Sequence, residues 1–151
     1  ECGMPTLRFN YRGVGKSEGE YGEIIGEVDD CQAVVEWVKA QLPEFKLAFA
    51  GFSFGSYIAA NRAQVNGAQW LISIGPPVER MPFDTLTSMQ CPWLVVQGDD
   101  DEVISAPATY AWAQNPPSPL QLIKMDDTSH FFHGQLIALR EHLIAWLAKQ
   151  S

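Results

Sequence analysis

The sequence predicts an α/β fold, with a mostly parallel sheet of about five strands and helices on both faces. Short apolar runs typical of buried strands alternate along the chain with longer segments that have helical periodicity. Because a helix between two strands forms a right-handed crossover, this alternation places the strands parallel. The 151 residues are 46% hydrophobic, which is enough for one sizeable core. We therefore expect a single domain over residues 1–151.

The elements follow in order from these patterns. Apolar runs predict strands at 5–10, 46–51, 69–74, 92–97 and 120–125. One-sided apolar spacing predicts helices at 27–42, 54–66, 105–115 and 134–149. The stripe of the first helix comprises Val28, Cys31, Val34, Val35, Val38 and Leu42, and that of the last comprises Leu136, Leu139, Leu143, Trp146 and Leu147. Loops are expected at 11–26 and at 75–90.

The pentapeptide Gly51-Phe52-Ser53-Phe54-Gly55 lies between a predicted strand and a predicted helix. A Gly-x-Ser-x-Gly motif in that context is typical of a nucleophile elbow, a sharp turn that exposes the serine Oγ above the sheet. A tight structural turn with a capping serine is the alternative interpretation. If Ser53 is a nucleophile, an acid and then a histidine must follow it along the chain.

Both partners follow in that order. The turn Gly98-Asp99-Asp100-Asp101-Glu102 leaves the predicted strand 92–97, and His130 lies in the turn after the strand 120–125. The carboxyl ends of parallel strands share one sheet edge, so these side chains are expected there together. Physical reasoning alone leaves Asp99, Asp100 and Asp101 equivalent, since any of them could be a solvated turn residue or a helix cap.

These motifs resemble those of the α/β-hydrolase superfamily, especially its small, lidless prokaryotic members related to dienelactone hydrolases. The matching pieces are residues 8–17, 51–55, 98–103 and 129–132. The resemblance implies a catalytic triad of Ser53, Asp101 and His130, because the family's acid stands three residues after the glycine. It implies no cofactor and no metal.

The implied chemistry is acyl transfer to water through a serine ester, with the Phe54 backbone amide as one oxyanion-hole donor. Small carboxylic esters are the expected substrates, as for a carboxylesterase, while thioesters, lactones and peptides remain alternatives. Phe52, Phe131 and Phe132 flank the catalytic residues and are expected to line a small apolar pocket, although packing against helices is an equal alternative. The segment 75–90 is too short to form a lid, so an open site is expected.

The resemblance covers the C-terminal two thirds of such an enzyme. The family's first strands, and the loop that supplies its second oxyanion donor, lie outside the part that the resemblance covers, either because residues upstream have been lost or because the protein is naturally short. The alternative function is therefore a non-catalytic binding or assembly module built on a truncated hydrolase fold. The absence of the family's third strand would leave a gap between the strands at 5–10 and 46–51. This gap closes either by direct pairing of those two strands in a monomer or, as we expect, by a homodimer through an exposed sheet edge at Thr6-Leu7-Arg8-Phe9.

The charge and composition of the chain limit which classes of partner are expected. The net charge of -8 would repel nucleic acids and anionic membranes, so neither is expected as a partner. The sequence has no apolar run long enough to span a bilayer. Its three cysteines are odd in number and widely spaced, which suits a reducing compartment, and a cytoplasmic location is expected.

Two rival motifs are disfavoured. The run Asn10 to Ser17 ends in Gly-Lys-Ser, as a phosphate-binding loop does, but an acidic, glycine-rich stretch follows where that loop needs a helix. We expect a structural turn there, with Arg12 paired to local carboxylates. His130 and His133 have spacing that could fit a metal, helped by Asp126 or Asp127. No Cys or Glu recurs nearby, however, and the triad accounts for His130 without a metal.

Overall fold

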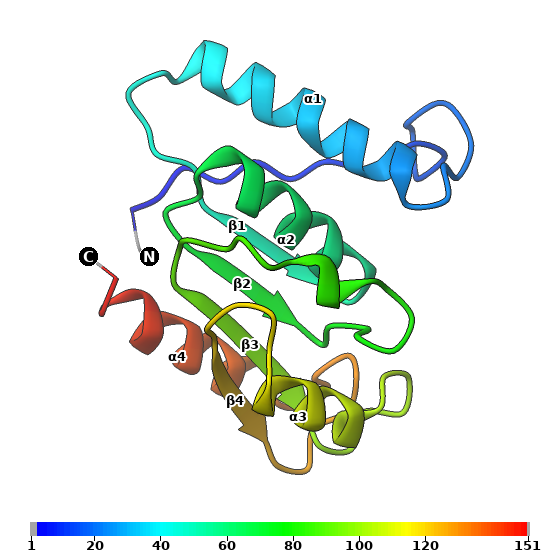
Figure 1. The fold of residues 1–151 in the computed structure, drawn as a ribbon, viewed down its shortest axis with the longest axis vertical. Coiled ribbons are helices and arrows are strands. Elements are labelled where there is room, and N and C mark those ends of the chain that lie inside the picture. Colours follow the sequence, from blue (N-terminus) through cyan, green and yellow to red (C-terminus); the bar gives the residue numbers. More distant parts are fainter. Residues whose placement is uncertain (1–2, 151) are drawn as a thin grey trace. The chain divides into compact units, whose positions relative to one another are not determined.

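The structure is a computed structural model that describes residues 3–150. The chain divides into two compact units, Glu1–Phe45 and Lys46–Ser151, and each is described by itself (Figure 1). In order, their helices and strands are α1 (Ile25–Gln41), then β1 (Phe49–Phe52), α2 (Phe54–Asn66), β2 (Leu71–Ile74), the 3-10 helix η1 (Phe83–Thr85), β3 (Trp93–Gly98), α3 (Ala106–Gln114), β4 (Gln121–Met125) and α4 (Leu136–Leu147).

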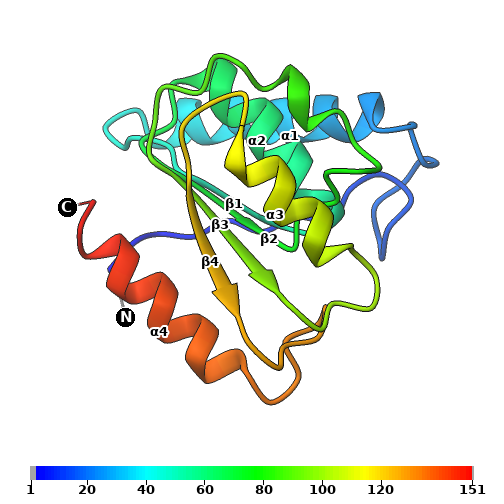
Figure 2. The same ribbon diagram turned by 60° about the horizontal axis from the view of Figure 1, so that its bottom comes forward.

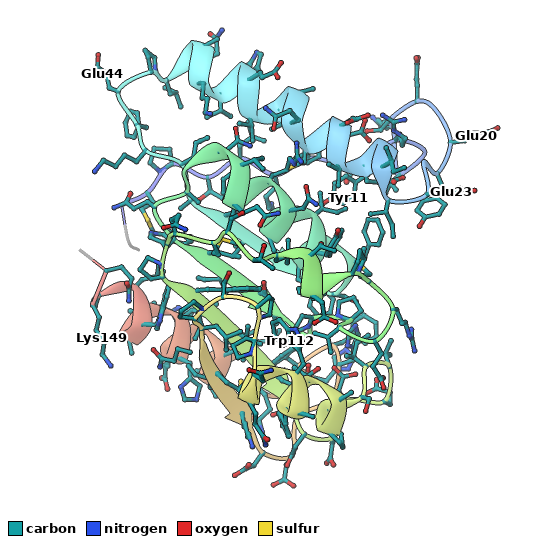
Figure 3. All side chains as sticks on the ribbon, in the orientation of Figure 1. Tyr11, Glu20, Glu23, Glu44, Trp112 and Lys149 are labelled. Carbon is teal, nitrogen blue, oxygen red and sulfur yellow. The ribbon has the colours of Figure 1, made fainter. Side chains whose placement is uncertain are left out.

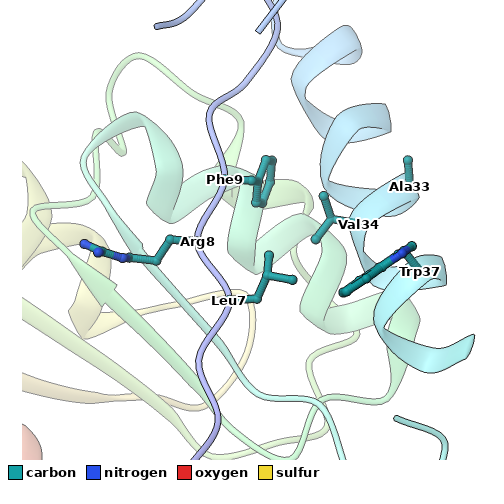
Figure 4. A pocket seen from close by; sticks show the side chains of 6 residues that line it. All are labelled: Leu7, Arg8, Phe9, Ala33, Val34 and Trp37. Atoms are coloured by element: carbon teal, nitrogen blue, oxygen red, sulfur yellow. The ribbon is translucent and has the colours of Figure 1, made fainter. Parts of the chain in front are cut away.

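The first unit consists of an extended segment, a turn-rich loop and helix α1. Residues 3–10 have no strand assignment, so the strand expected at 5–10 is wrong. A strand requires a partner that satisfies its N–H and C=O groups in a ladder, and an apolar run alone does not supply one. Leu7 and Phe9 of this segment, with Val34 and Trp37 of α1, line an apolar hollow of about 440 Å³ (Figure 4).

Two acidic residues of α1 fix the loop before it. The Arg12 guanidinium donates to both carboxylate oxygens of Asp30, at 2.7 Å from Nη2 to Oδ1, and the Arg12 N–H donates to Oδ2 at 2.9 Å. The Glu27 carboxylate accepts from the N–H groups of Gly22 and Ile24 at 2.8 and 3.0 Å. The pairing of Arg12 with a local carboxylate is therefore confirmed. No helix follows Ser17 directly, which also argues against a phosphate-binding loop.

The second unit contains a four-stranded parallel sheet in the order β1-β2-β3-β4. Its register pairs Phe49 with Leu71, Leu71 with Trp93, and Leu94 with Gln121. The α/β fold class predicted from the sequence is confirmed, with four paired strands in the described part of the chain. Each strand is shorter than or shifted by a few residues from its expected range, as is usual at element ends.

Helices cover both faces of this sheet (Figure 2). On one face α4 buries Leu139 and Trp146 against Ile72, Leu94 and Val96. On the other face α2 contacts β1 and β2, and α3 contacts β3. Because side chains alternate along a strand, Trp93, Val95 and Gln97 face α2 and α3, whereas Leu94 and Val96 face α4.

An aromatic cluster fills the face opposite α4. Trp112 of α3, labelled in Figure 3, contacts Trp93 and Phe83 edge-on, with ring centroids 5.6 and 5.5 Å apart. Phe83 in turn contacts Tyr57 of α2 at 5.4 Å, and the Trp93 indole N–H donates to Ser73 Oγ at 3.1 Å. Such edge-on pairs add about 0.5–1.5 kcal/mol each beyond the area they bury.

The segment 75–90 lies against this core and does not form a lid. It contains η1 and buries four apolar side chains at intervals of two or three residues, namely Met81, Phe83, Leu86 and Met89. Among the helices formed by residues 3–150, none combines the length and the apolar character needed to cross a bilayer.

Candidate active site

Ser53 stands at the turn between β1 and α2, as the motif predicts. Its φ of 49° and ψ of -122° are unfavourable for a residue with a Cβ, and such strain is typical of functional turns. The Ser53 N–H donates to the Ile74 carbonyl at 2.8 Å, which ties the turn to β2. A Cβ on Gly51 would collide with the Gly55 carbonyl and Ser56 Cα, so only glycine permits so close an approach of strand and helix.

Asp101 lies in the turn after β3, and each of its carboxylate oxygens accepts two hydrogen bonds. Oδ1 accepts from the N–H groups of Val103 and Ile104 at 2.9 and 2.7 Å. Oδ2 accepts from Gln97 Nε2 at 2.9 Å and lies 2.8 Å from His130 Nδ1. Burial alone would raise the pKa of Asp101, but these four hydrogen bonds outweigh it and hold the pKa below its ordinary value. The carboxylate is therefore ionised at neutral pH.

His130 lies in the turn after β4 and joins the other two residues. Its Nδ1 faces Asp101, and its Nε2 lies 3.1 Å from Ser53 Oγ. An ionised Asp101 accepts from Nδ1–H, which leaves Nε2 to accept from the serine hydroxyl. The side chains of His130 and Asp101 are 3% and 1% exposed. Ser53, His130 and Asp101 are thus joined in a hydrogen-bonded line. Within it, the side chains of His130 and Asp101 are shielded from water.

The aromatic residues named from the sequence divide into two groups. The rings of Phe52 and Phe131 lie 4.9 and 5.1 Å from the His130 ring, and both side chains are exposed. Phe132 is instead 2% exposed and packs in the core against α4, so its expected place in the pocket is wrong. Phe54 is the first residue of α2.

The remaining candidates lie outside the hydrogen-bonded line. Asp99 Oδ1 accepts from the Thr128 N–H at 3.4 Å, and Asp100 is exposed. His133 is exposed beside Phe131, with ring centroids 6.0 Å apart. Both nitrogens of His130 already have hydrogen-bonding partners, so a metal would have to displace one of them. Within residues 3–150, His, Cys, Asp and Glu form no group of three that could hold a metal ion.

Sequence reasoning missed two contributors, Gln97 and Glu102. Gln97 is fully buried on β3 and donates to Asp101, and Glu102 accepts from the His130 N–H at 3.0 Å. The signal for Gln97 was its position as the one polar residue at the end of an apolar strand. Glu102 gave no separate signal, because it follows three other acids.

Comparisons with known proteins identify the superfamily of the chain. No model of a protein family matches the sequence. An uncharacterized protein of Rickettsia prowazekii, RP471, is 35% identical over 112 residues, which are 69% of this chain and 46% of that protein. The solved structure of an α/β serine hydrolase homologue from Coxiella burnetii is 47% identical, with a TM-score of 0.89, over 93% of this chain and 67% of its own. The chain belongs to the α/β-hydrolase superfamily.

A second solved relative is described as having no lid. A lidless α/β serine hydrolase from Xanthomonas campestris is 44% identical, with a TM-score of 0.86. This α/β-hydrolase chain spans less than half of the curated relative's length. It spans 67% of the Coxiella chain and 65% of the Xanthomonas chain. The comparisons show the superfamily, and the expected relation to dienelactone hydrolases stays a prediction.

Proposed function

We propose that the chain is a serine hydrolase that cleaves small carboxylic esters through an acyl-serine intermediate, with Ser53, His130 and Asp101 as its catalytic residues. The observation that carries the proposal is the pair of short contacts at His130, one to Ser53 Oγ and one to Asp101 Oδ2. A nucleophile within reach of a base, itself oriented by a third group, is the arrangement that activates a serine.

The first half-reaction forms the acyl-enzyme. His130 Nε2 takes the Ser53 hydroxyl proton while Oγ attacks the ester carbonyl carbon, and the bond to the alcohol oxygen then breaks. The same proton passes from Nε2 to that oxygen, and the alcohol leaves. Asp101 stabilises the imidazolium that forms between these two steps. Its four hydrogen bonds keep it ionised for this purpose.

The second half-reaction returns the free enzyme. A water loses a proton to His130 Nε2 and attacks the acyl carbon, and the Ser53 oxygen leaves with that proton. In both halves negative charge develops on the carbonyl oxygen. Ser53 lies at the N-terminus of α2, where backbone N–H groups point outward and the helix dipole favours an anion. We assign the Phe54 amide as one donor to this oxyanion.

The side chains around Ser53 and His130 indicate the kind of substrate. Phe52 and Phe131 are 40% and 54% exposed, and their ring centroids lie 6.1 Å apart beside His130. Exposed aromatic rings beside the nucleophile favour a small apolar acyl or alcohol group. The excess of acidic residues disfavours a strongly anionic ester.

A phosphonate probe tests this function. A fluorophosphonate should label wild-type protein at Ser53, as located by peptide mass spectrometry, and a short p-nitrophenyl ester should be hydrolysed. Ser53→Ala and His130→Ala should each abolish turnover with an unchanged circular dichroism spectrum. Because the residues act as a unit, the double variant should be no worse than either single one.

Retention of most turnover by Ser53→Ala would exclude the acyl-serine mechanism. A wild-type chain that is folded but neither labelled nor active would favour the alternative, a non-catalytic binding or assembly module. The two functions are therefore separated by one labelling experiment.

A further inference from the structure

The turn that carries Asp101 also holds the backbone of His130. The His130 N–H donates to Glu102 Oε2 at 3.0 Å, while the ring of the same residue contacts Asp101, one position earlier in the sequence. Neighbouring carboxylates thus bind the main chain and the side chain of one histidine. The ring contact sets how the imidazole is rotated, and the backbone contact sets where its Cα stands.

Several backbone contacts join the same two turns. The Asp99 N–H donates to the Met125 carbonyl at 3.0 Å, and the Asp100 N–H donates to the Thr128 carbonyl at 3.2 Å. A Cβ on Gly98 would collide with that same Thr128 carbonyl, so glycine allows the turns to touch. The contact of Glu102 with His130 continues this series to the catalytic histidine itself.

We propose that Glu102 is a positioning residue that holds His130 in place for proton transfer, an inference that rests on the proposed hydrolase function. Proton transfer requires Nε2 to stay within hydrogen-bond reach of Ser53 Oγ. The 3.1 Å distance between these atoms leaves little room for a shift of the turn. Glu102 is exposed and acts only through the His130 backbone, so it is not a catalytic residue.

Charge strengthens this contact. The bond from the His130 N–H is the main reason that the pKa of Glu102 lies below its ordinary value, with the Glu102 N–H as a further donor. Asp101 and His130 are the titratable groups that act on Glu102, the first opposing its charge and the second favouring it. A carboxylate accepts more strongly from an N–H group than a neutral amide does. Glutamine at this position should therefore preserve the contact only in part.

The test compares three variants of the full chain. Glu102→Ala removes the acceptor, Glu102→Gln keeps a neutral acceptor, and Asp100→Asn removes an exposed carboxylate of the same turn that contacts no residue of the histidine turn through its side chain. On a p-nitrophenyl ester, Glu102→Ala should lower kcat about tenfold with KM little changed, since a positioning contact acts in the transition state. Glu102→Gln should recover about a third or more of the kcat that Glu102→Ala loses, and Asp100→Asn should have the kcat of wild type.

A second readout keeps the inference separate from the proposed function. The amide proton resonance of His130 should move upfield in Glu102→Ala, because a hydrogen bond to a carboxylate is lost, and should stay in place in Asp100→Asn. Equal kcat for Glu102→Ala and Asp100→Asn in an active enzyme would overturn the positioning role. If wild type is inactive the hydrolase proposal fails by itself, and an unmoved His130 amide in Glu102→Ala would overturn the contact as well.

Discussion

Asp101 receives more hydrogen bonds than any neighbour in its turn. Two come from the N–H groups of Val103 and Ile104, which bind one oxygen, and two come from Gln97 and His130, which bind the other. Asp99 and Asp100 precede it in the same turn, yet neither contacts His130. Position within the turn, and not acidity, decides which carboxylate orients the imidazole.

Replacement of the Asp101 carboxylate by an amide should severely reduce ester turnover. Asp101→Asn should lower ester turnover by orders of magnitude, because the amide favours the wrong tautomer of His130. Asp99→Asn and Asp100→Asn should be much milder. Steady-state kinetics of the three variants check this. Greatest sensitivity at position 99 or 100 would mean that the family's spacing does not apply to this turn.

The same hydrogen bonds make stability depend on pH. The pKa of Asp101 is lower in the folded chain than the ordinary value of about 3.9, so its ionised form stabilises the fold fully above that value. This contribution is lost as pH falls through the lowered pKa of the folded state. Asp101→Asn should therefore be less stable than wild type at pH 6, and the gap should narrow below pH 4. Urea unfolding between pH 3 and 6 measures this, and a constant gap would contradict it.

The sequence identified Ser53 and His130 through motif and order, because the strand ends that carry them could be recognised from apolar runs. The choice of Asp101 needed the family resemblance, since three adjacent acids look alike in the sequence. Glu102 could not be predicted, because its contact with His130 depends on the distance between two turns that lie 28 residues apart in the sequence. Gln97 lies only four residues before Asp101, but its role depends on which acid of the turn faces it, and the three adjacent acids are alike in the sequence.

At the scale of elements, the turn after β4 is anchored on both of its sides. His130 points to Ser53, and Phe132, two residues later, is buried against Leu139 and Trp146 of α4. Phe132 also has a φ of 55°, which is unfavourable for so bulky a residue. Burial of the ring outweighs this strain and fixes the turn between the strand and the helix.

Loss of this anchor should be costly. Phe132→Ala should destabilise the chain by about 3–5 kcal/mol, the usual cost of removing a buried phenylalanine. Phe131→Ala is a matched control, because that ring is 54% exposed, and it should change stability by about 0.5 kcal/mol or less. The free energy of unfolding in urea distinguishes them. Equal losses would show that Phe132 does not anchor the turn.

Strand prediction succeeded where an apolar run also has a neighbouring strand to pair with. The runs at 92–97 and 120–125 lead into polar turns and form β3 and β4, which pair in parallel with each other. Residues 5–10 alternate apolar and polar side chains, another strand-like pattern, but have no ladder in the described structure. A strand is a property of a pair, so a sequence pattern predicts it only when a partner is available.

At the scale of the whole molecule, several large apolar side chains of the first unit remain open to solvent. Leu7, Phe9 and Trp37 are 45%, 36% and 56% exposed, and all three line the hollow of Figure 4. The main chain of residues 3–10 belongs to no strand ladder within the described part. An extended segment outside any strand ladder, beside an apolar hollow, is prone to pair with another chain.

We therefore expect the 151-residue chain to form a homodimer through Thr6-Leu7-Arg8-Phe9. Light scattering should give about twice the monomer mass of 16.8 kDa at micromolar concentration. Leu7→Lys should shift the protein to the monomer, because a buried lysine in the contact costs more than the pairing gains. Val65→Lys is the control: this residue is 60% exposed on α2, and its replacement should leave the dimer intact. A wild-type monomer of 16.8 kDa would rule out the pairing, and a dimer that tolerates Leu7→Lys would place the contact elsewhere.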